Sequence, residues 1–259
     1  MSALPPPGCS EERTVHDGVL PGGNIGAPRR DGETVIRAGG QGSNFSRRLL
    51  RFFADRQWNG APRLRSVDAR GVETLDFIEG EVPWPHPVPD WAVTDDALRD
   101  LARLTRAFHD LAAGSDLVAG AQTVCHNDLS PSNTVYAGST DGARPIAFID
   151  WDAAAPGPRL DDVAHLAWQW LELGPGISDV SEAARRLRIL ATAYGPEIER
   201  PALVARIHWW QERTWRGIQA QAADDDPARR RLVERGVAQG IRAAAAWTAA
   251  HAAELTKDS

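Results

Sequence analysis

The chain has 259 residues, which is enough for one large domain or two lobes and for a substantial hydrophobic core. Its net charge of −6 provides no concentrated basic surface for nucleic acid, and no apolar run approaches the roughly 18 residues that span a bilayer. Two cysteines are too few for a disulfide framework or a cysteine-based metal cluster. The proline-rich start lacks the apolar core of a signal peptide, so we expect a cytoplasmic protein.

The first 80 residues predict a small lobe that contains strands and one helix. Glycine and proline interrupt residues 1–32, where Gly22–Gly26 is either a glycine-rich loop over phosphates or an ordinary turn. Residues 33–37 and 71–78 have the composition of strands. Between them, apolar side chains recur at helical spacing over residues 45–53.

The composition changes after a proline-rich tract between residues 83 and 89, which predicts a linker. A helix is expected to begin at Thr94, and further helices are expected over residues 162–173, 181–194, 201–222 and 227–253. One hairpin, with strands 134–136 and 145–149 around a turn-rich tract, interrupts them. The sequence therefore predicts an α+β protein with an N-terminal lobe (residues 1–80), a hinge (81–92) and a large helical lobe (93–259).

The strongest chemical signal is His126-Asn-Asp-Leu-Ser-Pro-Ser-Asn133, followed by an apolar strand that ends at Asp150. Asp128 lies in an irregular loop, where its carboxylate can accept or orient the proton of a hydroxyl group. Asn133 and Asp150 offer a neutral and a charged oxygen, and Mg²⁺ prefers such hard donors. These residue types suit phosphoryl transfer, in which positioning and charge neutralisation dominate catalysis.

This constellation resembles the catalytic segment of the aminoglycoside phosphotransferase family, which is related to the protein kinases. The resemblance is tightest over residues 124–166 and implies a two-lobed, protein-kinase-like fold with a small sheet lobe and a large, mostly helical lobe. It also implies Mg²⁺ and ATP or GTP as cofactors, with Asp128 as catalytic base and with Asn133 and Asp150 on the magnesium ion. By the same resemblance, His126 braces the loop through backbone hydrogen bonds.

Two further aspartates accompany this segment. Asp162 begins the next predicted helix, so we expect it to be the N-cap, and in the resembled family an aspartate here also ties that helix to the catalytic loop. Asp152 is either a ligand or close neighbour of the metal, or a solvated loop residue.

The small lobe departs from the family pattern. Kinase-like enzymes hold the nucleotide phosphates with a strand lysine paired to a helix glutamate, but the only lysine of this chain is Lys257. Arg37 occupies the matching strand position and keeps the charge, although an ordinary surface arginine is the alternative. Arginines stand on the following helix where a glutamate is expected, so the ion pair is absent or supplied from elsewhere. Phe77, Ile78 and Glu79 fall on the expected hinge strand, whose backbone would bind adenine or guanine.

The sequence thus predicts a phosphotransferase that moves the γ-phosphate of a magnesium nucleotide to a hydroxyl group of a small molecule. The acceptor would be an antibiotic such as an aminoglycoside or macrolide, or a metabolite. A non-catalytic, nucleotide-binding pseudokinase is the alternative, because the lysine and glutamate are missing. A metal-dependent hydrolase is a weaker alternative, because no further His or Cys ligands follow at short spacing. We expect no nucleic-acid or membrane partner, and the oligomeric state stays open.

Overall fold

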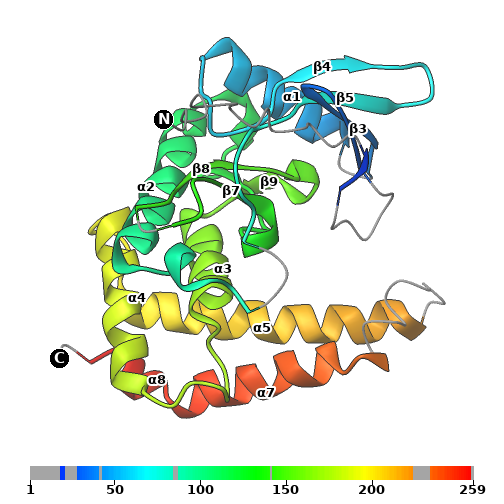
Figure 1. Cartoon of the computed structure of the whole chain (residues 1–259). Coiled ribbons are helices and arrows are strands. Elements are labelled where there is room, and N and C mark those ends of the chain that lie inside the picture. The colour runs from blue at the N-terminus through cyan, green and yellow to red at the C-terminus, as the bar shows by residue number, and fades with distance from the viewer. Residues whose placement is uncertain are drawn as a thin grey trace, which may run out of the picture.

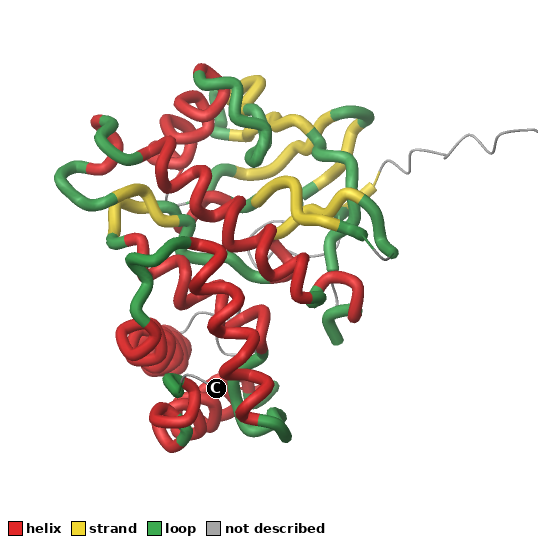
Figure 2. The backbone as a smooth tube through the Cα atoms, turned by 90° about the vertical axis from the view of Figure 1, so that its left-hand side faces the viewer, coloured by secondary structure: helices red, strands yellow, loops and turns green. Residues whose placement is uncertain are grey.

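The structure is a computed structural model of the chain, and it describes residues 18–20, 28–40, 43–83, 87–140, 142–223 and 234–257. Figures 1 and 2 show the strands gathered in the upper part of the molecule, and in Figure 1 the helices α5 (Arg200–Ala223) and α7 (Val237–Ala250) cross its lower part. This arrangement confirms the predicted α+β class. The candidate phosphate loop, Gly22–Gly26, lies outside the described residues.

In the described part of the chain, the small lobe contains a five-stranded antiparallel sheet with the order β1-β2-β3-β5-β4. Its strands are β1 Gly18–Val19, β2 Arg29–Asp31, β3 Thr34–Ala38, β4 Leu64–Val67 and β5 Val72–Asp76. The prediction of strands at β3 and β5 is confirmed. Sequence reasoning missed β1, β2 and β4, which have two to four residues each and so are too short to show the apolar alternation of a half-buried strand.

Helix α1, Ser43–Asp55, packs beside this sheet in the position that its periodicity predicted (Figure 1). Leu49, Leu50 and Phe53 form its buried face, with at most 2% of each side chain exposed. The rings of Phe53 and Trp151 lie 5.0 Å apart at a steep angle, an attractive edge-to-face contact. The helix is therefore fixed against the segment that carries Asp150.

The chain leaves β5 and joins the large lobe through a short antiparallel bridge. Glu81 and Tyr136 exchange two backbone hydrogen bonds, of 2.9 and 2.8 Å. A Cβ atom at Gly80 would lie 2.4 Å from the carbonyl oxygen of Tyr136, so only glycine allows this approach. Residues 84–86 of the predicted hinge lie outside the described residues, and the hinge boundaries stay a prediction.

Six described helices build most of the large lobe. They are α2 Asp95–Ala112, α3 Arg159–Leu171, α4 Val180–Tyr194, α5 Arg200–Ala223, α7 Val237–Ala250 and α8 Ala252–Leu255. Thr94 caps α2 by accepting a hydrogen bond from the backbone N–H of Ala97. Of the helix predicted over residues 227–253, residues 227–233 lie outside the described residues, and the rest forms α7 and α8, which are separated at His251. In the described residues, none of the helices has the length and apolar composition to cross a bilayer.

Two small sheets bring together the two loops that carry the predicted catalytic and metal-binding residues. Strands β7 Thr134–Ala137 and β8 Arg144–Phe148 form the predicted hairpin. Strands β6 Thr123–Cys125 and β9 Ala155–Gly157 form a second pair, and the apolar composition of residues 123–125 is typical of a strand. The sequence did not predict β9, which has only three residues. The loop after β6 carries Asp128, and the loop between β8 and β9 carries Asp150, so the two pairings place both loops side by side.

Candidate active site

The buried carboxylate of Asp162 anchors the loop from His126 to Asn133, which we call the catalytic loop because it carries the predicted base. Its two oxygens accept hydrogen bonds from the backbone N–H groups of His126 (2.7 Å) and Asn127 (2.8 Å), and His109 donates a third (3.0 Å). Burial alone would raise the pKa of Asp162, but the hydrogen bond from His109 and the nearby histidines hold it below its ordinary value. The carboxylate is therefore ionised and acts as an acceptor for the loop.

The expectation that Asp162 caps its helix is wrong. Helix α3 begins at Arg159, with Pro158 at the N-cap position, so Asp162 lies within the first turn. Its side chain points to the catalytic loop because two loop N–H groups need an acceptor inside the protein. The expected tie between this helix and the loop is present.

His126 braces the loop, as predicted. Its Nδ1 accepts the backbone N–H of Asp128 at 3.2 Å, and its Nε2 lies 3.0 Å from the carbonyl oxygen of Ile149. A carbonyl can only accept, so Nε2 carries the ring proton and the neutral tautomer is defined. The ring is fully buried, which leaves it no access to a substrate.

Asp128 and Asn133 contact each other directly. The amide nitrogen of Asn133 donates to the carboxylate Oδ2 of Asp128 (2.9 Å) and to its backbone oxygen (3.0 Å). Both partners are acceptors, so the orientation of the amide is defined and its Oδ1 remains for a cation. The backbone oxygen of Asn133 accepts from the N–H of Ile149 (2.9 Å), which ties it to the residue before Asp150. The structure thus brings all three predicted residues into one site.

Asp150 and Asp152 face the small lobe from the end of β8. Asp150 is exposed and Asp152 is half-buried. Burial raises the pKa of Asp152, and the neighbouring carboxylates add to this effect against the opposing charge of Arg37. Asp152 is therefore a partner in the site and not a solvated loop residue.

Arg37 reaches three carboxylates at once. Its Nε lies 3.0 Å from Glu73, and its two terminal nitrogens donate to Asp150 (2.9 Å) and Asp152 (2.6 Å). Burial would lower the pKa of Arg37, but the charges of Asp152, Glu73 and Asp150 outweigh it and raise the pKa. With 13% of its side chain exposed, Arg37 is not an ordinary surface arginine.

Sequence reasoning missed Glu73, which supplies the ion pair that the helix lacks. Glu73 stands opposite Arg37 in the register of β3 and β5 and is 0% exposed. Its second carboxylate oxygen accepts from Nε of Arg47, on α1, at 2.7 Å. A glutamate within a strand is common, so the sequence alone does not indicate that Glu73 pairs with Arg37. The pairing follows only from the register of the two strands.

The prediction that Phe77, Ile78 and Glu79 lie on a strand is wrong, because β5 ends at Asp76 and these residues follow it. The backbone N–H of Phe77 donates to the carbonyl of Glu33 (2.9 Å), which removes that group as a donor to a base. The guanidinium of Arg30 lies 3.5 Å from the centre of the Phe77 ring and pairs with the carboxylate of Glu79. Contact of this segment with a nucleotide base stays a prediction, which now rests on Ile78 and Glu79.

His109, Cys125 and Asp162 form a buried group whose donor atoms lie within 4.8 Å of one another. Burial raises the pKa of the Cys125 thiol, which disfavours the thiolate that a metal needs. Both His109 nitrogens are already bonded, to Asp162 and to the hydroxyl of Tyr194 (2.7 Å). This group packs the base of the catalytic loop and does not support a hydrolase.

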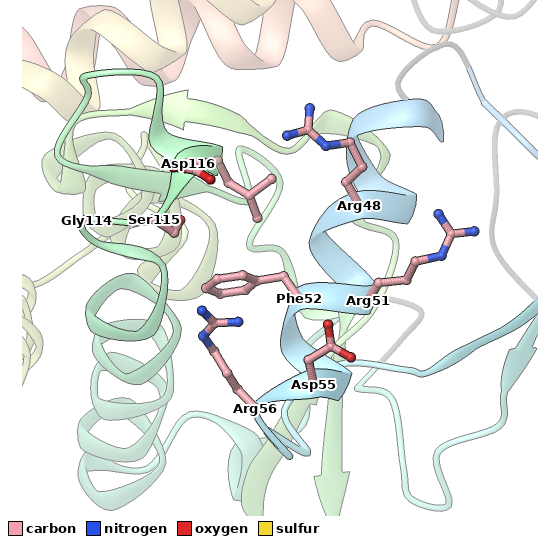
Figure 3. A pocket seen from close by; sticks show the side chains of 9 residues that line it. Arg48, Arg51, Phe52, Asp55, Arg56, Gly114, Ser115 and Asp116 are labelled. Atoms are coloured by element: carbon pink, nitrogen blue, oxygen red, sulfur yellow. The ribbon is translucent and has the colours of Figure 1, made fainter.

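A separate cavity of about 440 Å³ lies between α1 and the loop that follows α2 (Figure 3). It is lined by Arg48, Arg51, Phe52, Asp55, Arg56, Gly114, Ser115, Asp116 and Leu117. None of the predicted catalytic or metal-binding residues contributes to it, so it is not the catalytic site.

Comparison with known proteins identifies the family. Residues 112–203, which include the whole catalytic segment, match the family model described as the phosphotransferase enzyme family. The chain is also 30% identical over 199 residues to the trifolitoxin immunity protein of Rhizobium leguminosarum bv. trifolii, covering 68% of this chain and 73% of that protein. The chain therefore belongs to the phosphotransferase enzyme family, and its resemblance to aminoglycoside phosphotransferases is confirmed.

Solved structures confirm the protein-kinase-like fold. A choline/ethanolamine kinase family protein from Mesorhizobium loti superposes with a TM-score of 0.63 at 15% identity, covering 94% of this chain and 93% of that one. A GDP complex of aminoglycoside 2′-phosphotransferase-IIIa gives 0.59 at 12% identity, covering 90% and 94%. A macrolide 2′-phosphotransferase from Brachybacterium faecium gives 0.54 at 15% identity, covering 82% and 88%. Fold and family together define the chain as a phosphotransferase.

Proposed function

We propose that this protein transfers the γ-phosphate of a magnesium nucleotide, ATP or GTP, to a hydroxyl group of a small molecule. The observation that carries the proposal is the convergence of Asp128, Asn133, Asp150 and Arg37 on one site between the lobes, from three separate segments of the chain. Each residue type matches a task that phosphoryl transfer requires: accepting a proton, binding a metal ion and neutralising phosphate charge.

Asp128 is the proposed catalytic base. Asn133 holds its Oδ2, so its Oδ1 is the oxygen available to an acceptor hydroxyl. As the acceptor oxygen bonds to phosphorus and the bond to the leaving nucleoside diphosphate breaks, the hydroxyl proton passes to this carboxylate. The hydrogen bond from Asn133 fixes the carboxylate plane and so orients the hydroxyl for in-line attack.

Asn133 and Asp150 would hold the magnesium ion. Oδ1 of Asn133 is not used by the hydrogen bonds to Asp128, and Asp150 is exposed at the end of β8, so the donor set fits a hard cation. When bound, the ion would supply neutralisation of the charge on the transferring phosphate. Two protein oxygens alone make a weak site, so metal and nucleotide should bind together.

Arg37 and the segment after β5 would hold opposite ends of the nucleotide. Glu73, which contacts Arg37, lies on β5 four positions before Phe77, a distance of about 13 Å in an extended chain. That separation allows the base to meet Ile78 and Glu79 while the phosphates meet Arg37. Backbone recognition of this kind suits either purine, so both donors must be tested.

A phosphorylation screen tests the function. Purified protein, Mg²⁺ and either ATP or GTP are incubated with aminoglycosides, macrolides, amino alcohols and sugars, and acceptor-dependent release of nucleoside diphosphate is measured. We expect transfer to at least one acceptor, with a mass increase of one phosphate on that acceptor. Nucleotide binding without transfer to any acceptor would favour the pseudokinase alternative.

The curated relative adds one class of acceptor to this screen. It is named for immunity to trifolitoxin, so a toxin is a candidate substrate for this chain as well. A host that expresses the protein should then survive trifolitoxin better than a host that expresses a variant without Asp128. Equal survival of the two hosts would exclude phosphorylation of this toxin as the activity.

A further inference from the structure

Glu73 is a carboxylate with no exposed surface, and it lies between two arginines. Arg37 on β3 contacts one of its oxygens (3.0 Å) and Arg47 on α1 contacts the other (2.7 Å). A buried charge is expensive unless it is paired and hydrogen-bonded, and here both oxygens are paired. The arrangement therefore holds Glu73 rigidly, and Glu73 in turn holds Arg37.

Arg37 donates the N–H at the Nε edge of its guanidinium to the carboxylate of Glu73. The two terminal nitrogens point instead toward Asp150 and Asp152, on the other lobe. A guanidinium is planar and has five N–H donors, so fixing the Nε edge also fixes the direction of the other four. Glu73 thus decides where the phosphate-binding end of Arg37 points.

Arg47 connects this pair to the helix. In addition to Glu73, it donates to the carbonyl oxygen of Gly71 (3.0 Å), just before β5. Helix α1 is therefore tied to the strand that carries the glutamate, and a shift of α1 would move Glu73.

We propose that Glu73 is the positioning residue for the phosphate-binding arginine, and that Arg47 fixes Glu73 from α1. In the expected pattern a strand supplies the cation and a helix supplies the carboxylate. Here the helix supplies the cation, Arg47, and a strand supplies the carboxylate, Glu73. This inference rests on the proposed role of Arg37 in nucleotide binding. It explains how the chain manages without the lysine and helix glutamate of the expected pattern.

The experiment compares ATP with adenosine, or GTP with guanosine if GTP is the donor, by calorimetry in the presence of Mg²⁺. In Glu73→Gln, we expect the preference for the triphosphate over the nucleoside to fall by about tenfold or more, as for loss of a charge-assisted hydrogen bond. Affinity for the nucleoside should not change. In Asp76→Asn, which removes a half-buried carboxylate of the same strand that pairs with Arg65 on the neighbouring strand β4, the preference should be that of the wild type.

Arg47→Gln provides a second test if Glu73→Gln fails to fold. It should reduce the preference for the triphosphate in the same direction, and Arg47→Lys should restore part of it. The matched control is Arg48→Gln, at the next position of α1, where the side chain is exposed. The double variant Arg47→Gln/Glu73→Gln should be no worse than Glu73→Gln alone, because Arg47 acts through Glu73.

Two failures can be told apart. If the wild type shows no preference for the triphosphate, the proposed function fails before Glu73 is tested. If the wild type prefers the triphosphate and folded Glu73→Gln or Arg47→Gln keeps that preference, Glu73 is a structural residue only and the inference is wrong.

Discussion

Asn127 and Asp150 both adopt the left-handed backbone conformation, with φ angles of 64° and 62°. Such a conformation costs a residue other than glycine on the order of 1–3 kcal/mol, and asparagine and aspartate tolerate it best. Both residues lie where a strand gives way to a loop of the site. The turn at Asn127 directs its N–H to Asp162, and the turn at Asp150 directs that carboxylate toward the small lobe.

Replacing Asp128 tests the catalytic base. Asp128→Ala should lower turnover by about 10²–10⁴-fold, because the acceptor hydroxyl loses its proton acceptor. Nucleotide affinity should stay close to that of the wild type, since the carboxylate acts on the acceptor. Steady-state kinetics and nucleotide titration of the folded variant measure both quantities. Equal losses of turnover and nucleotide affinity would contradict this role.

Replacing Asp150 tests the metal site. Asp150→Asn removes the charged ligand but keeps the shape, so the Mg²⁺-dependent part of nucleotide binding should be lost. Titration of nucleotide with and without Mg²⁺ measures that part directly. Asp116→Asn, an exposed aspartate outside the site, is the control. Unchanged magnesium dependence in Asp150→Asn would show that Asp150 is not a ligand.

Replacing Arg37 tests the phosphate contact. Arg37→Ala should lower the affinity for ATP more than the affinity for adenosine, because only the triphosphate contacts the guanidinium. Arg37→Lys should restore part of the loss if charge matters more than the two-pronged geometry. Titrations of ATP, ADP and adenosine against each variant decide the matter. An equal effect on all three ligands would mean that Arg37 only supports the strand.

Among the elements, one tryptophan joins both lobes behind the catalytic loop. Trp151 is 1% exposed, and its ring lies 5.0 Å from Phe53 on α1, 5.1 Å from Phe108 on α2 and 4.5 Å from His126. Its Nε1 donates to the carbonyl of Phe148 (2.9 Å). Because Trp151 stands between Asp150 and Asp152, this packing fixes the position of both carboxylates.

The packing of Trp151 predicts a large loss of stability on truncation. Trp151→Ala should lower the free energy of unfolding by about 3–5 kcal/mol, since it leaves a cavity between α1 and α2. Trp209→Ala is the matched control, because Trp209 is 39% exposed and should lose less than about 1 kcal/mol. Urea denaturation measures both. A similar loss in the two variants would show that the ring of Trp151 does not hold the lobes.

For the whole molecule, a buried histidine predicts how stability depends on pH. Burial lowers the pKa of His165, which is 6% exposed and whose Nδ1 has no hydrogen-bond partner in the described part of the chain. At a pH below 6.5, the ordinary pKa of histidine, the His165 ring binds a proton in the unfolded chain but stays neutral in the folded protein. The stability contributed by neutral His165 is therefore complete above that pH and is lost as the pH falls.

The free energy of unfolding should decrease by up to about 1.4 kcal/mol for each pH unit below 6.5 from this group alone. Buried His109, whose pKa burial also lowers, adds to the slope. Urea denaturation between pH 5 and 8 measures the slope in the wild type and in His165→Gln. The variant should have a shallower slope, and identical slopes would contradict the assignment.

The sequence by itself determined the parts of this protein that are local along the chain. Within the loop from His126 to Asn133, side chains form hydrogen bonds with other residues of the same loop. The helices follow from the apolar periodicity within each segment. The fold class, the family and the bracing role of His126 could be predicted for this reason. Strands β1, β2, β4 and β9 could not be predicted, because such short segments carry too little periodic signal.

Only the tertiary structure decided which distant charges meet. Glu73 faces Arg37 through the register of two strands that are separated by α1, and no local pattern sets that register. Asp162 looks like a helix cap in sequence, yet it accepts two N–H groups from a loop 36 and 35 positions away. A carboxylate bonds to the donors that folding places beside it, so its partners depend on packing and not on its neighbours in the chain.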